Sequence, residues 1–538
     1  MDQAEYNRLK NAIDLAIDRV LSKGTDDLFR PPIFSKSIEN LIIEGNAEEF
    51  RTEAFRQTLD FLKQADLQQK QIGPTRRTLV AKDENTFRQV AWLDPFDAVR
   101  YLSLAILAFQ KIEPIRPPKA ANIVHSHRPS DAWDHLFDEK FGYDSFRVES
   151  SRLSKEYVGK WKVVTDIANF FDRIGNHTLE NHLLNAGLEH KFSKLVSEVL
   201  FFWAGDRRSF GVPVGSDASR ILSEAVLLNV DQKLIDAGVV YVRYVDDFRI
   251  FAESKACALK CVERLTTLLA DEGLSLNSRK TEIFQIIEPE EAALLANRFA
   301  TGEHEVLDLD ERIEIRRRIR VSGQSAISKF YREPGKDAVK KIKAIPKEKI
   351  ELMISDESDH QFENVLKLIV KYFIYVDQDV RIISLLLKRR LTSIIYLSDA
   401  FTKEAEKFSS DKCAEICATI YNEVDWENCA YPLQIPILRL SANKSFWEPK
   451  YACGIVDNHL QTDSMLFFRE AVSLGYPCLD RARIRHLAID VFANVPDFVR
   501  RAIYWAAKNH TELSDDEKRP LLKNMKQHGA DWFVARAP

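Results

Sequence analysis

The chain has 538 residues, of which 45% are hydrophobic and 29% charged, and its formal net charge is −4. This composition is typical of globular proteins that bury a core, and the length predicts about three domains. Its seven cysteines are scattered without a CxxC pair, which argues against a secreted disulfide framework. No stretch approaches the roughly 20 apolar residues of a membrane span, and the N-terminus lacks a signal-peptide pattern. We therefore expect a cytoplasmic protein without membrane contacts.

The first 75 residues are predicted to form an N-terminal helical extension. Residues 1–22 have the pattern of an amphipathic helix that ends at Gly24, with its apolar side formed by Leu9, Ile13, Ile17 and Val20. Residues 76–300 mix helix and strand patterns. Within them, Asp94 followed by Pro95 predicts the start of a helix.

Three segments of this mixed region predict a site built from aspartates at strand ends. Residues 161–166 form an apolar strand that ends in Asp166, and residues 211–220 form a glycine- and proline-containing loop before a helix over 221–234. Residues 239–251 predict a strand, a tight turn with Asp246 and Asp247, and a second strand. Adjacent buried carboxylates raise each other's pKa, so we expect a divalent cation between them. An ordinary Asp-Asp turn is the alternative.

The succession of elements predicts an α+β fold. A helix ending at Gly273 follows the hairpin, and residues 274–284 return as a turn and a strand. Strand, helix, hairpin, helix and strand in this order are typical of a split βαβ sheet.

The remaining chain divides into a basic segment and a helical region. Residues 301–350 are interpreted as a thumb-like or linker segment, because thirteen Lys or Arg against four Asp or Glu between residues 312 and 349 give a balance of +9. Such a track can grip a phosphate backbone, and a solvated helix face is the other interpretation. Residues 351–538 predict an all-α, HEAT-like, repeat-like C-terminal domain, with helical stretches at 362–376, 380–397, 411–421, 484–492 and 499–508 and proline-containing loops between some of them.

The three aspartate-bearing and loop segments together resemble motifs A, B and C of the palm of reverse transcriptases, over roughly residues 160–285. The loop Pro213, Val214, Gly215, followed by Ala218, Ser219 and Arg220, is similar to that of bacterial abortive-infection, or defence-associated (unknown-group), reverse transcriptases. Residues 93–98 and 124–128 add to this resemblance, although His127 stands where many of those proteins have an aromatic residue.

The resemblance implies right-hand polymerase fingers and palm that transfer dNTPs with Mg²⁺ or Mn²⁺ in a two-metal-ion site. Asp166, Asp246 and Asp247 would be catalytic and would hold the metal together with the carbonyl of Ile167. The residues expected to bind the nucleotide are Phe171 beneath the sugar, where it excludes a 2′-hydroxyl, Gly215 in the loop, Lys280 at the motif D position, and Arg128 on the triphosphate, with Lys119 and Arg88 as the other candidates for that role.

The family resemblance also implies anti-phage defence by abortive infection. It implies DNA synthesis that can proceed without a conventional template, priming from a protein hydroxyl, a homo-oligomer, and dNTPs, a single-stranded DNA product and RNA as partners. Two alternatives stay open. One is a retron or group II intron-type reverse transcriptase that copies a dedicated RNA. The other is a catalytically silent palm scaffold that senses phage products.

Overall fold

The computed structural model divides the chain into two compact units. One comprises Met1–Leu28, Glu48–Arg77 and Val90–Ser325, and the other Phe29–Ala47, Thr78–Gln89 and Ala326–Pro538. The structure describes residues 2–25, 37–64, 67, 72–81, 86–204, 209–286, 331, 333–355, 362–425, 428–462, 464–527 and 531–537. In these ranges, no helix is both long and apolar enough to cross a membrane. Most of the predicted basic segment, including Arg316, Arg317 and Arg318, lies outside the described residues.

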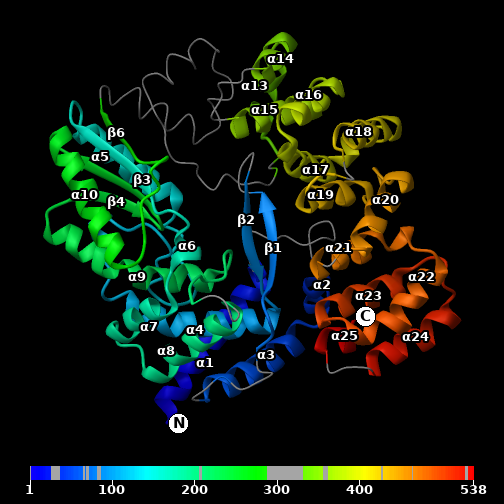
Figure 1. Ribbon diagram of the computed structural model, residues 1–538, viewed down its shortest axis with the longest axis horizontal. Coiled ribbons are helices and arrows are strands. Elements are labelled where there is room, and N and C mark those ends of the chain that lie inside the picture. The colour runs from blue at the N-terminus through cyan, green and yellow to red at the C-terminus, as the bar shows by residue number, and fades with distance from the viewer. Residues whose placement is uncertain are drawn as a thin grey trace. The chain divides into compact units, whose positions relative to one another are not determined.

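The first unit is an α+β structure around a four-stranded sheet (Figure 1). Its elements are α1 Gln3–Lys23, α3 Ala47–Leu62, α4 Pro95–Ile112, η1 Lys119–Ala121, α5 Tyr143–Glu156, β3 Trp161–Asp166, α6 Phe170–Arg173, α7 Asn176–Asn185, α8 His190–Ala204, α9 Asp217–Asp236, β4 Val240–Tyr244, β5 Asp247–Ala252, α10 Lys255–Asp271 and β6 Glu282–Gln285. A separate hairpin, β1 Arg76–Ala81 and β2 Phe87–Trp92, contributes residues to both units.

Local signals in the sequence set the ends of the first helices. The carboxylate of Asp2 accepts a hydrogen bond from the Glu5 N–H, which caps α1, and Gly24 ends that helix at a φ of 83° that a glycine adopts without strain. Asp94 caps α4 in the same way, with a proline in the first turn. Both predicted helices are therefore confirmed.

The sheet has the order β4-β5-β3-β6, and its neighbouring strands are antiparallel. Because side chains alternate along a strand, one face carries Arg243 and Phe248, and the other carries Tyr244, Asp247 and Asp166. Arg243 bonds to a residue of α9, which places α9 on the first face.

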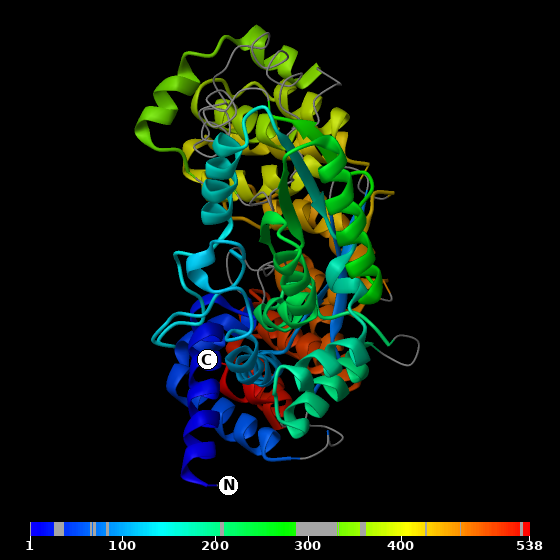
Figure 2. The ribbon, with the colours of Figure 1, turned by 90° about the vertical axis from the view of Figure 1, so that its left-hand side faces the viewer.

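Helix α5 covers the opposite face of the sheet, the one that bears Asp166 and Asp247. Phe146 and Leu153 of α5 pack with Val242 and Phe251 of the sheet. Figure 2 shows α5, in cyan, and α10, in green, on opposite sides of the strands. The candidate site is therefore built at one end of a sheet that has helices on both faces.

The second unit, as far as it is described, consists of helices apart from its share of the β1–β2 hairpin. They are α2 Ile38–Gly45, α13 Lys336–Lys343, α14 Lys347–Ser355, α15 Phe362–Tyr375, α16 Arg381–Arg389, η3 Leu391–Ser393, α17 Ile394–Lys403, η4 Ala405–Lys407, α18 Ser410–Glu423, α19 Tyr431–Ser441, α20 Pro449–Leu460, α21 Met465–Gly475, η5 Tyr476–Cys478, α22 Arg481–His486, the π-helical η6 Leu487–Val491, η7 Phe492–Asn494, α23 Asp497–Asn509, α24 Asp515–Gln527 and α25 Trp532–Arg536.

Several features of this unit differ from the predictions. The helix expected over 380–397 is interrupted at Arg390, whose extended backbone separates α16 from η3 and α17. Prolines assigned to loops lie within helices: Pro432 and Pro449 occupy first turns, where a missing N–H costs little, and Pro436 lies inside α19. The helices α19, α20, α21, α24 and α25 lie outside the predicted helical stretches.

Candidate active site

Three aspartates meet at one end of the sheet. Asp166 is the last residue of β3 and Asp247 is the first of β5, and the two are direct partners in the antiparallel register. Asp246 lies in the turn between β4 and β5, and its carbonyl accepts the N–H of Ile167 at 3.1 Å. Like charges directly opposite each other on neighbouring strands repel. The fold therefore holds these carboxylates together against their electrostatic preference.

The titration of these groups reflects that repulsion. Burial, followed by the charge of Asp247, raises the pKa of Asp246 to about 7. The pKa of Asp247 is also raised, by burial and by Asp166, although Arg249 and Lys280 oppose the shift. The Lys280 ammonium donates to Oδ2 of Asp166 at 2.6 Å while remaining 36% exposed. A cation thus already compensates part of the negative charge.

The donor set fits a hard divalent cation. Oδ1 of Asp166 is buried and has no hydrogen-bond partner, so this oxygen can accept a ligand without losing a bond. Carboxylate and carbonyl oxygens are the ligands that Mg²⁺ prefers. In the part of the chain that the structure describes, no group of three or more His, Cys, Asp or Glu side chains is already arranged to hold a metal. The three aspartates would have to close further around an ion.

The turn that carries Asp246 has an unusual backbone. Val245 has a φ of 55°, in the left-handed region that β-branched residues rarely adopt. Such conformations persist only where the surroundings enforce them. Here the Arg243 guanidinium donates to the carbonyl of Val245 at 3.3 Å.

The buried charges behind this turn were not predicted from the sequence. They are Arg243, Glu224, Asp231 and Arg116, whose side chains are at most 1% exposed. A signal was present: Arg243 stands in an otherwise apolar strand, and a buried arginine requires acidic partners. The identity of those partners was not visible, because they lie on other elements.

The predicted sugar-binding residue lies beside the glycine loop. Phe171, on α6, is partly exposed, whereas its neighbour Phe170 is 2% exposed and belongs to the core. The carbonyl of Phe171 accepts the N–H of Val212 at 2.9 Å, which joins α6 to the loop. Gly215, at the end of that loop, has a φ of 107°, a conformation that requires glycine.

Two of the three cations predicted for the triphosphate, Arg128 and Lys119, are engaged elsewhere. Arg128 is 2% exposed, and its guanidinium pairs with Glu113 at 2.6 Å and donates to a backbone carbonyl. Lys119 pairs with Asp131 and Asp138. Both Nη atoms of the buried Arg128 guanidinium are bonded within the fold, so these donors do not support a triphosphate-binding role.

Aromatic side chains line the neighbourhood of the turn. Tyr244 contacts Tyr143 of α5, with ring centroids 5.4 Å apart, and His127 at 5.8 Å. Burial lowers the pKa of His127 to about 3, which keeps its ring neutral at physiological pH. The face beside Asp247 therefore carries aromatic rings together with Arg249, whose Nη1 lies 3.9 Å from the Asp247 carboxylate.

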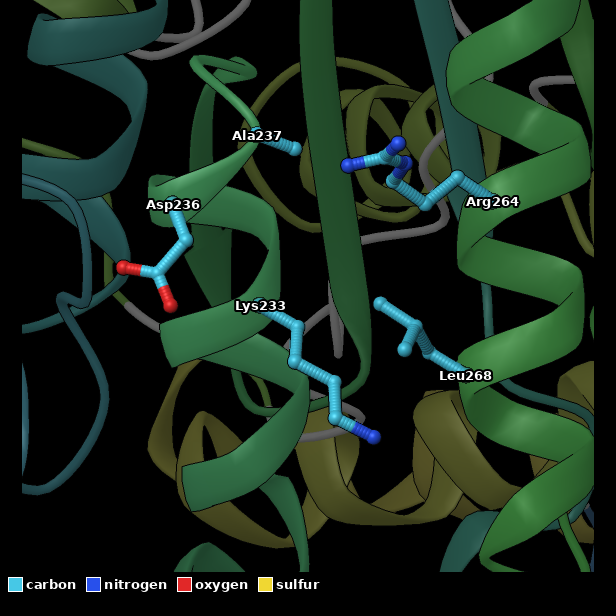
Figure 3. A pocket seen from close by; sticks show the side chains of 5 residues that line it. All are labelled: Lys233, Asp236, Ala237, Arg264 and Leu268. Atoms are coloured by element: carbon cyan, nitrogen blue, oxygen red, sulfur yellow. The ribbon is translucent and has the colours of Figure 1, made fainter.

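A cavity in the same unit lies away from the aspartates. It has a volume of about 290 Å³ and is lined by Lys233, Asp236, Ala237, Arg264 and Leu268. Figure 3 shows Lys233 and Arg264 reaching into the space between α9 and α10. Ala237 precedes β4, whereas the aspartate turn follows that strand, so the cavity and the candidate site lie at opposite ends of β4.

Comparison with known proteins identifies the part of the chain that contains the three aspartates. Residues 112–323 match the family model described as reverse transcriptase (RNA-dependent DNA polymerase). The chain carries a reverse transcriptase domain. All three aspartates lie within the matched residues, and the domain is of the RNA-directed DNA polymerase-like nucleotidyltransferase type.

Among solved structures, this chain is similar to two yeast telomerases in complex with a fragment of telomeric RNA. The telomerase of Candida albicans has 13% sequence identity and a TM-score of 0.28. The match covers 73% of this chain and 65% of the telomerase chain. That of Candida tropicalis has 14% identity and a TM-score of 0.30, covering 68% and 64%. The chain thus spans a little under two thirds of these telomerase chains. No curated protein matches it.

Proposed function

We propose that this chain is a DNA polymerase of the reverse transcriptase type, which adds deoxynucleotides by metal-dependent nucleotidyl transfer. The observation that carries the proposal is the convergence of Asp166, Asp246 and Asp247, with Lys280 on one of them, inside a reverse transcriptase domain. Three acids at one end of a sheet are costly without a cation, and phosphoryl transfer uses such a cluster.

The side chains have distinct proposed roles. Asp166, Asp246 and Asp247, with the carbonyl of Ile167, would hold Mg²⁺ or Mn²⁺. When bound, such ions lower the pKa of the attacking hydroxyl and neutralise charge on the leaving pyrophosphate. Lys280 is within reach of the same point, because its ammonium already contacts Asp166. It can donate a hydrogen bond or a proton to the leaving group.

We further propose the finer assignments that the defence-associated family suggests. These are anti-phage activity by abortive infection, in the cytoplasm, by a homo-oligomer that makes single-stranded DNA. Synthesis without a conventional template and priming from a protein hydroxyl belong to the same proposal, as does contact with RNA. Residues 76–300 would act as fingers and palm, 301–350 as a thumb, and the HEAT-like helices of 351–538 would contact subunits or product.

The decisive test replaces one carboxylate without changing its size. Asp246→Asn should reduce dNTP incorporation at least about 1000-fold, because the residual amide cannot supply the anionic ligand. Asp172→Asn is the matched control: Asp172 is an exposed acid in the first turn of α6, so its loss should leave activity within about twofold. A thermal unfolding curve first shows that each variant is folded. The incorporation of dNTPs is then measured on separate, folded samples.

Two outcomes contradict the proposal. Undiminished incorporation by Asp246→Asn would remove the polymerase assignment. A folded wild-type protein that incorporates no nucleotide with Mg²⁺ or Mn²⁺, with or without an RNA template, would favour the silent scaffold. Sequencing the nucleic acid that copurifies with the wild type separates templated from untemplated synthesis.

A further inference from the structure

The strand that leads into the aspartate turn carries a buried arginine whose donors are all used. Nε and Nη2 of Arg243 bind both oxygens of Asp231, with the shortest contact at 2.5 Å, and Nη2 also donates to Glu224 at 2.8 Å. Nη1 donates to the Val245 carbonyl at 3.3 Å and lies 3.5 Å from the Ser126 hydroxyl. The residue is 0% exposed.

Its contacts connect its own strand with two further parts of the domain. Glu224 accepts the hydroxyl of Ser126 at 2.6 Å and the guanidinium of Arg116 at 3.0 Å. The backbone of Arg243 is held as well, since its N–H donates to Ile123 and its carbonyl accepts from His125. Helix α9, the segment after α4 and strand β4 therefore meet at this one side chain.

This arrangement is not explained by stability alone. Buried ion pairs pay a large desolvation cost, and apolar side chains of similar volume often stabilise a fold as well or better. What an apolar side chain cannot do is donate to the Val245 carbonyl. That carbonyl belongs to the residue with a φ of 55°, directly before Asp246.

We propose that Arg243 is a positioning residue that clamps the turn between β4 and β5, so that Asp246 and Asp247 stay beside Asp166 despite their mutual repulsion. The clamp works through one hydrogen bond to the Val245 carbonyl, braced by Asp231 and Glu224 from α9. Arg243 does not touch substrate, and its role in activity rests on the proposed polymerase function. The clamp itself is a property of the turn and can be measured without catalysis.

The test variant is Arg243→Lys, which keeps the positive charge beside Asp231 but lacks the second arm needed to reach Val245. Hydrogen–deuterium exchange of the peptide over residues 241–251 should rise at least about tenfold. The kcat for dNTP incorporation should fall about 10- to 100-fold, as ångström-scale misplacement of a catalytic group does, with the dNTP KM changed less than about threefold.

Tyr241→Phe is the matched control. The Tyr241 hydroxyl binds the same Asp231 at 2.8 Å, on the same strand and the same face, but does not contact the turn. Its loss should leave both exchange and kcat within about twofold of wild type. If Arg243→Lys does not fold, the charge-neutral pair Arg243→Gln with Asp231→Asn gives the same test, because the shorter glutamine cannot span to Val245.

Folded Arg243→Lys with wild-type exchange and kcat would overturn the clamp, and so would a Tyr241→Phe variant with equal losses. If the wild type has no activity, the proposed function fails but the exchange comparison still decides the clamp. Raised exchange with an unchanged kcat would show that the clamp exists. It would also show that catalysis does not depend on the clamp.

Discussion

At the scale of single residues, the candidate site combines electrostatic repulsion between carboxylates with a strained backbone, and the fold keeps the aspartates close together despite this repulsion. Asp166 faces Asp247 across two strands, and Val245 holds a left-handed backbone between Tyr244 and Asp246. Each feature alone costs free energy, and both occur within one turn. Clustering of this kind is typical of functional sites, whereas the neighbouring Phe170 is ordinary core.

We propose that one side chain, that of Phe171, decides the choice between ribose and deoxyribose. Phe171 is partly exposed, unlike Phe170, and its backbone is joined to the glycine loop. We predict that Phe171→Val admits ribonucleotides, because the smaller side chain makes room for a 2′-hydroxyl. Competition between dATP and ATP should shift at least about tenfold toward ATP, with dATP incorporation largely kept. A wild-type protein that already prefers ATP would contradict the steric role.

At the scale of elements, buried ion pairs join helices that are distant in the chain. In the second unit, Arg469 of α21 contacts Glu39 of α2 at 2.7 Å and Glu470 at 3.0 Å, and Arg501 of α23 contacts Glu39 at 3.3 Å and Asp531, before α25, at 2.9 Å. Such networks fix which helix faces which, since only one arrangement satisfies the charges.

One member of this network should make stability depend on pH. Burial raises the pKa of Glu470 to about 7 from an ordinary 4.5, although Arg469 and Arg439 oppose the shift. The folded state therefore binds this proton more tightly than the unfolded state does. The contribution of Glu470 to the unfolding free energy is fully present below pH 4.5 and is lost as the pH rises through 7. Relative to wild type, Glu470→Gln should gain up to about 3 kcal/mol in unfolding free energy between pH 4.5 and 8.

Urea unfolding of both proteins across this pH range measures the difference. The comparison removes the effects of other titrating groups, because these are the same in both proteins. One such group is His459, whose pKa is lowered by burial to about 4 and whose effect on the unfolding free energy has the opposite pH dependence. Wild-type and Glu470→Gln curves that run parallel would show that Glu470 is ionised in the folded state throughout the range.

At the scale of the whole molecule, the N-terminal residues are shared between the two units. Helix α1 and nearly all of α3 belong to the first unit, whereas α2, between them in sequence, belongs to the second unit with residues from 326 onward. The two units are therefore not independent segments of chain. Stability of the helical unit should depend on residues near the N-terminus.

Glu39→Ala tests this dependence. Its carboxylate is 0% exposed and compensates Arg469 and Arg501, so its removal should cost about 3–5 kcal/mol, as the loss of one partner of a buried ion pair does. Hydrogen–deuterium exchange in α21 and α23 should rise accordingly. Glu48→Ala, which removes an exposed acid at the start of α3, is the control and should stay within about 0.5 kcal/mol. Unchanged exchange in α21 and α23 would refute the dependence.

Structural features that depend on residues close together in the chain could be predicted from the amino-acid sequence. Capping residues and apolar spacing predicted α1 and α4, the alternation of apolar residues around two aspartates predicted the β4–β5 hairpin, and the order of elements predicted the sheet that brings Asp166 to Asp247. These signals act over a few residues, within one turn or one strand, and so they are legible in the chain.

The pairing of buried charges became visible only in the tertiary structure. It paired Arg128 with Glu113 within the fold, gave Arg243 its partners Asp231 and Glu224, and joined Glu39 to an arginine 430 positions away. Any of many acids could neutralise a given arginine, and no spacing in the sequence marks which one does. The choice is made by packing, because a buried charge is stable only where the fold brings its partner within hydrogen-bond distance.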